Sequence, residues 1–193
     1  EDKEKNKSIV LKALGNLESY VDKKNPVPSS DLSSDLVLST CKNLVSLMEE
    51  EQKTVEKVRL LKNEADRIRG WGDFNPKEVE ELSKMGINLH FYALTKKDLK
   101  ALGEDPEVSF IPVKNDNGLG VAVIGDALKR DYQLSEFMLP EKSLGELESL
   151  AILGEKRVEE IRSIFRSSTS YIPSISSWLK NEEEAILLDN VNA

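Results

Sequence analysis

The chain has 193 residues, of which 39% are hydrophobic and 32% are charged, with 27 Lys and Arg against 35 Asp and Glu. This balance is typical of a folded chain, and the formal net charge of -8 argues against nucleic acid as a partner, because phosphate binding requires basic side chains. No run approaches the ~18 apolar residues of a membrane span. We therefore expect a water-soluble polypeptide.

The chain begins at Glu1 rather than at methionine, and its helical pattern continues to Ala193. These two features lead us to expect a fragment of a longer protein.

Two amphipathic helices are predicted before residue 70. Residues 8–22 place apolar side chains at helical spacing, and the proline-containing run KKNPVP ends this pattern. A second helix is predicted over about 31–69, with a length of roughly 58 Å at 1.5 Å per residue. Its apolar positions form a heptad seam: Val37, Cys41, Leu44, Met48, Val55, Val58, Ala65 and Ile68.

A stricter heptad pattern runs from Leu144 to Ile186. It predicts a second long helix, with a kink near Pro173 because proline removes an intrahelical hydrogen bond. Two long helices that cannot bury their seams alone are expected to pair as an antiparallel, coiled-coil-like hairpin.

The segment between the two seams has a mixed pattern. It predicts a helix over 76–85, a strand over 87–94, a helix capped by Thr95 and Asp98, and two strands joined at Asn117-Gly118 in a type I′ turn. A short helix over 126–130 and a strand over 133–140 complete the segment. This order predicts a small ferredoxin-like α/β lobe and an α+β fold class. The expected divisions are residues 1–69, 70–142 and 143–193.

The motif that begins GWGDFNP is predicted to be a structural joint. Asn75 is placed to cap the helix that begins at Pro76, with Glu78 bonding back to the cap amide. Glycines allow the chain to change direction, and the aromatic side chains are expected to fill the space between the long helix and the sheet. The joint comprises Gly70, Trp71, Gly72, Asp73, Phe74, Asn75 and Pro76.

No catalytic, cofactor-binding or metal-binding residue is predicted. His90 is the single histidine, and no serine, cysteine or carboxylate is marked by sequence as its partner. Cys41 lies on the heptad seam, which favours core packing over a nucleophilic role. One histidine and one cysteine cannot form a zinc site. The acidic runs at 49–51 and 182–184 are interpreted as solvated helix faces.

With these parts in order, residues 54–150 resemble one known family. The sequence LLKNEADRIRGWGDFNPKEVEELSKMGINLHFYAL, followed by a lobe that ends in FMLPEKSLGELE, is similar to the cytoplasmic N-terminal domain of subunit I of bacterial and archaeal V-type (A-type) ATP synthases. That subunit is a relative of the eukaryotic V-ATPase a subunit. The resemblance implies that this chain contributes the long helices and the distal lobe of the domain.

The resemblance also implies a function. The domain is a non-catalytic stator component that grips the peripheral stalk subunits E and G and continues into a membrane domain that carries protons or sodium. The expected location is the cytoplasmic face of the membrane, with no cofactor and no small-molecule substrate. The family's intramembrane arginine has no counterpart here. Possible stalk contacts are Lys96, Lys97 and Lys100, although lysines on a merely solvated helix face would give the same sequence pattern.

Two other classes of function stay open from sequence. One is a small-molecule-binding regulatory domain, but such domains favour glycine between the first strand and its helix, where this chain has Leu94-Thr95-Lys96. The other is a coiled-coil adaptor or homodimer, since heptad seams also pair between chains.

Overall fold

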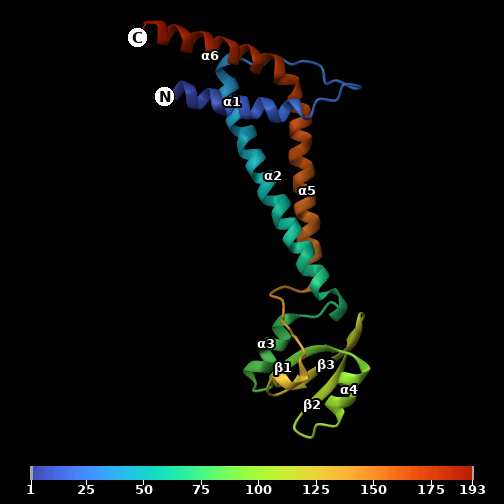
Figure 1. The fold of residues 1–193 in the computed structure, drawn as a ribbon. Helices are drawn as coiled ribbons and strands as arrows, with labels where there is room; N and C mark the ends of the chain where they lie inside the picture. The colour runs from blue at the N-terminus through green and yellow to red at the C-terminus, as the bar shows by residue number, and fades with distance from the viewer. Residues whose placement is uncertain (1, 193) are drawn as a thin grey trace. The chain divides into compact units, whose positions relative to one another are not determined.

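The computed structural model describes residues 2–192. The chain divides into two compact units: the first contains the described residues up to Lys57 and from Leu153 onward, and the second spans Val58–Ile152. Long helices and a four-stranded antiparallel sheet confirm the predicted α+β class (Figure 1). Among residues 2–192, no helix has the length and apolar character that crossing a membrane demands.

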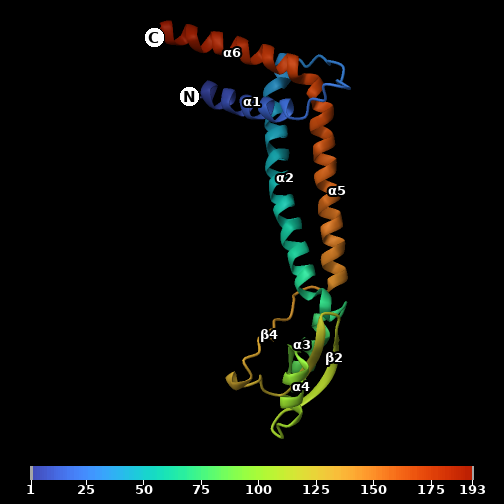
Figure 2. The same cartoon turned by 45° about the vertical axis from the view of Figure 1, so that its right-hand side comes forward.

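The first unit is helical. It contains α1 (Asp2–Glu18), the first part of α2 (Ser34–Ile68), the later part of α5 (Leu144–Ser168), the 3-10 turn η3 (Thr169–Tyr171) and α6 (Ile172–Asn192). Helices α1 and α6 run side by side in both views (Figures 1 and 2). One core joins all four helices: Val10, Ala13, Leu14, Leu17, Val37, Cys41, Leu44, Ile161, Phe165 and Ile175.

The second heptad run is interrupted where the sequence predicted a kinked but continuous helix. Helix α5 ends at Ser168, and α6 begins at Ile172. Pro173 therefore lies in the first turn of a new helix, where its missing N–H costs no intrahelical hydrogen bond. The loop before α2 covers this break, because the amide of Ser30 donates to the carbonyl of Ser170 at 3.0 Å.

The end of α1 also differs from the prediction over 8–22. The helix ends at Glu18, and Val21, which the pattern placed on the buried face, is 45% exposed. Local hydrogen bonds account for the end, because the Ser19 hydroxyl and amide both donate to the carbonyl of Asn16.

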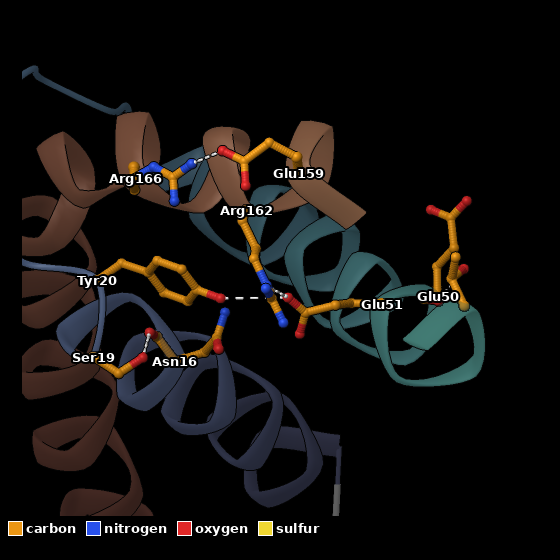
Figure 3. Close-up of polar contacts among 9 residues, drawn as sticks. Asn16, Ser19, Tyr20, Glu50, Glu51, Glu159, Arg162 and Arg166 are labelled. Atoms are coloured by element: carbon orange, nitrogen blue, oxygen red, sulfur yellow. Dashed lines mark hydrogen bonds and ion pairs between the residues drawn. The ribbon is translucent and has the colours of Figure 1, made fainter. Parts of the chain in front are cut away.

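Polar contacts add to the core of the first unit. Glu51 accepts hydrogen bonds from Arg162 Nε at 2.9 Å and from the Tyr20 hydroxyl at 3.3 Å, so one carboxylate joins the turn after α1 to α2 and α5 (Figure 3). Glu50 accepts two bonds from Arg157, at 2.8 and 3.1 Å. The interpretation of 49–51 as a merely solvated face was therefore wrong for these two residues.

The second unit contains the sheet. Its elements are η1 (Arg69–Trp71), α3 (Pro76–Lys84), β1 (Leu89–Leu94), α4 (Lys96–Gly103), β2 (Ser109–Asn115), β3 (Gly118–Ile124), η2 (Arg130–Tyr132) and β4 (Glu136–Phe137). The strand order is β2-β3-β1-β4, with every neighbouring pair antiparallel. Alternation along β1 sends Tyr92 and Leu94 into a core with Leu102 of α4, and Phe91 to the opposite face.

The ends of the two long helices that belong to this unit share a smaller core. Ala65 and Ile68 of α2 pack with Leu147 of α5.

The hairpin between β2 and β3 forms as predicted, but its turn is different. Asn115 pairs with Gly118, so the two loop residues are Asp116 and Asn117 rather than Asn117 and Gly118. Neither has the positive φ of a type I′ turn. Instead, the side chain of Asn115 accepts from the Asn117 amide at 2.9 Å, which forms an Asx turn.

The region after β3 contradicts two predictions. The helix predicted over 126–130 does not form, since only Arg130 of this range is helical, in the 3-10 turn η2, and the strand predicted over 133–140 is limited to Glu136–Phe137. Tertiary contacts explain the irregular path, because the Leu128 amide donates to the Tyr92 hydroxyl at 2.9 Å. Leu128, Tyr132 and Leu134 then pack against the sheet core.

Candidate functional site

The predicted joint lies within the second unit and contacts the tip of the β2–β3 hairpin. The carbonyl of the buried Gly70 accepts from the Asp116 amide at 2.8 Å. A Cβ atom at Gly70 would lie 2.7 Å from Nδ2 of Asn117, so the hairpin tip approaches the backbone closely here. Gly72 has a φ of 84°, which only glycine adopts readily.

Trp71 anchors an aromatic cluster on the face of the sheet opposite α4. Its ring stacks on Phe137 at a centroid distance of 4.9 Å and meets Phe91 edge-on at 5.9 Å. The guanidinium of Arg67 lies 5.0 Å from the centre of the Phe137 ring. Trp71 also covers Gly120, where a Cβ atom would be 3.1 Å from the indole. Beside these rings is an apolar cavity of about 220 Å³, which is also lined by Phe74, Val79 and Val113.

The remaining joint residues cap two helices. Asn75 accepts from the Lys77 amide at 3.0 Å at the start of α3, and Pro76 occupies the first helical position. Asp73 accepts from the Gly145 amide at 3.0 Å and so helps to cap α5. The sequence predicted the Asn75 cap, but nothing in it marked Asp73 for α5, because the two residues are 72 positions apart.

The three lysines proposed from sequence lie elsewhere. Lys96, Lys97 and Lys100 are exposed on α4, whose N-terminus carries the predicted capping box of Thr95 and Asp98. Because α4 packs on the Tyr92 face, the sheet separates these lysines from the Trp71 cluster. The structure therefore does not bring the two sets of predicted residues together.

A third feature was missed in the sequence. His90 has a carboxylate partner after all, since its Nδ1 faces Oε1 of Glu136 at hydrogen-bonding distance. The pairing follows from strand register: His90 precedes Tyr92 on β1, and Tyr92 lies opposite Glu136 on β4. Both side chains line a cleft of about 800 Å³ between α3, the start of β1 and the segment around β4. Only the pairing of β1 with the short strand β4 could have revealed this contact from sequence, and the predicted bounds of that strand were too wide.

Other titratable groups have structural roles. The pKa of the Asp105 carboxyl is lowered by the hydrogen bond from the Tyr132 hydroxyl, which in turn has its own pKa raised to about 12. Burial raises the pKa of the Cys41 thiol to about 11, as expected for a core side chain rather than a nucleophile. Among the described residues, no group of three or more His, Cys, Asp or Glu side chains is arranged to hold a metal ion.

The second unit thus presents an aromatic cluster, a lysine-bearing helix and the cleft that His90 and Glu136 line. The chain was compared with family models and with known proteins. No family model matches the chain. Part of the chain is similar to a subunit of a V-type ATP synthase.

The protein concerned is V-type ATP synthase subunit I of Borreliella burgdorferi, to which 78 residues are 31% identical. The aligned stretch is 40% of this chain and 13% of that relative's length, so the chain is similar to a small part of a much longer protein.

Proposed function

We propose that this chain is a non-catalytic stator segment of a rotary V-type ATPase and links the membrane sector to the peripheral stalks. The observation that carries the proposal is the 31% identity over 78 residues to a V-type ATP synthase subunit I. In this proposal the chain lies at the cytoplasmic face of the membrane and continues into its own membrane domain. Its partners are subunits E and G, and the complex couples ATP to proton or sodium transport.

The proposal includes a finer description of the fold. Helices α2 and α5 would form an antiparallel hairpin, and residues 70–142 a reduced ferredoxin-like lobe. The shared core and the arginine–glutamate pairs between α2 and α5 support the hairpin. The order β2-β3-β1-β4, with α4 between β1 and β2, supports the lobe, in which η2 takes the place of the second helix. Such paired helices would resist bending under rotor torque.

The test is to mix the chain with a purified E/G heterodimer of the same complex and to measure assembly by calorimetry and light scattering. We expect a one-to-one complex. A variant in which Lys96, Lys97 and Lys100 are replaced by glutamate should bind at least about tenfold more weakly, a loss of about 1.4 kcal/mol. The control replaces the exposed Lys12, Lys23 and Lys24 in the same way, which changes net charge equally.

Absence of a complex at about 0.1 mM, which corresponds to binding weaker than about -5.5 kcal/mol, would refute the stator proposal. If the chain instead forms a stable homodimer and does not bind the E/G heterodimer, the result would favour the coiled-coil adaptor. If both lysine variants weaken binding to the E/G heterodimer equally, α4 is not the contact surface.

A further inference from the structure

The cleft beside His90 has walls that are held in place by hydrogen bonds. The hydroxyl of Ser83 on α3 donates to the Asn88 side chain at 2.8 Å, and the Asn88 carbonyl accepts from the Gly125 amide at 2.9 Å. Next to the lining residue Leu139, the Met138 carbonyl accepts from Arg67 Nη1 of α2 at 2.8 Å. Because the first two bonds join α3, the residue before β1 and the residue after β3, which all line the cleft, this side of the cleft is preformed.

The lining of this cleft is strongly acidic. Four carboxylates line it, against one lysine and His90: Glu80, Asp126, Glu136 and Glu141. Within residues 2–192, Glu136 faces His90, whereas Glu80, Asp126 and Glu141 have no ion-pair partner. Unpaired carboxylates around a concave surface produce a negative potential that attracts cations.

Part of the cleft lining is apolar. Val79, Leu89 and Leu139 line it together with two prolines, and Leu139 remains 38% exposed. A ligand that satisfies both parts of this lining must carry positive charge and apolar surface close together. An arginine side chain is well suited, because its guanidinium binds carboxylates in a bidentate manner while its methylene stem covers apolar surface.

We propose that this cleft is a docking site for a protein segment in which arginine or lysine side chains alternate with apolar ones. Charge complementarity selects the cationic groups, and the exposed leucine selects their apolar neighbours. A protein segment fits better than a small amine, since the carboxylates come from four different parts of the chain and extend around an open cleft of about 800 Å³. The inference rests on the cleft alone and does not depend on the stator proposal.

The experiment uses the whole chain labelled with ¹⁵N and a six-residue peptide that alternates arginine and leucine. We expect saturable shifts of the amide signals of Leu89, Ala127 and Leu139, with smaller shifts on α4. The same peptide with citrulline in place of arginine keeps the shape but removes the charge, and should bind at least about fivefold more weakly. Agmatine, a small guanidinium compound, serves as a third probe.

Two matched variants test the location. Glu80→Gln with Glu141→Gln removes two exposed cleft carboxylates, and we expect at least about fivefold weaker binding of the arginine peptide. Glu104→Gln with Asp131→Asn removes two exposed carboxylates outside the cleft and should change binding less than about twofold. Retained amide spectra would confirm that both variants fold.

Three results would overturn the proposal. Equal weakening by the two variants would show that only net charge attracts the peptide. Binding of agmatine as tight as that of the peptide would identify a small-molecule site. Equal affinity for the arginine and citrulline peptides would show that the carboxylates do not contribute.

Discussion

Replacement of Trp71 by alanine tests whether the aromatic cluster holds the second unit together. Loss of a fully buried tryptophan costs about 3–5 kcal/mol, and because the Trp71 ring is half-buried we expect about 2 kcal/mol. Loss of the stacked contact with Phe137, at a centroid distance of 4.9 Å, is part of this cost. Hydrogen exchange of amides in β1 and β3 measures the free energy of opening this unit without interference from the first.

The comparison variant is Met85→Ala, in the same unit but with a side chain that is 74% exposed, and it should change stability by less than about 0.5 kcal/mol. A double-mutant cycle with Phe137→Leu should give a coupling energy of about 0.5–1.5 kcal/mol for the two rings. If Trp71→Ala changes the opening free energy no more than Met85→Ala does, the cluster does not stabilise the sheet and our account of the joint is wrong.

Four further predictions concern single residues. Gly15→Ala on the exposed surface of α1, where an added Cβ meets nothing within 4 Å, should raise the melting temperature by an amount equivalent to about 0.5–1 kcal/mol; a decrease would contradict this account of α1. Gly120→Ala should lower stability by about 1–3 kcal/mol in urea denaturation, because its Cβ would lie 2.9 Å from a backbone carbonyl of β2. An unchanged denaturation midpoint would show that the strand moves aside without a cost in stability. Cys41 should resist iodoacetamide at pH 8 in the native chain and react after unfolding, since burial raises the pKa of its thiol to about 11; rapid native labelling would show an open core. The hydrogen bond from Arg157 lowers the pKa of Glu50 below its ordinary value of 4.5. The stability that this bond provides is therefore present above pH 4.5 and is lost as the pH falls through the lower pKa of the folded state. Glu50→Gln should remove this part of the acid dependence of stability, and parallel pH profiles of the two proteins would contradict the pairing of Glu50 with Arg157.

Much of the secondary structure was predictable because local patterns decide it. The heptad spacing located α2 within three residues at its start and one at its end. The capping box of Thr95 and Asp98 formed as predicted, because both of its partners lie within one turn. The hairpin was predictable for the same reason, although the Asn115 side chain selected a different turn from the one that Asn117-Gly118 favours.

Three further features that sequence reasoning missed depend on contacts between distant residues. His90 meets Glu136 only because β4 pairs with β1, and Glu50 meets Arg157 only because residues of α2 and α5 share a core. The helix predicted over 126–130 does not form, because the Leu128 amide donates to the Tyr92 hydroxyl instead. In each case a partner more than 30 positions away in the chain decides the outcome, and local propensity carries no information about it.

The hydrogen bond between Asp73 and Gly145 has a consequence for protein engineering. Since it joins two residues 72 positions apart, the two ends of the segment between them lie close together. Insertions with closely spaced ends are transplanted readily between scaffolds. The segment between Asp73 and Gly145 could therefore be exchanged for a short linker, because its two ends lie close together.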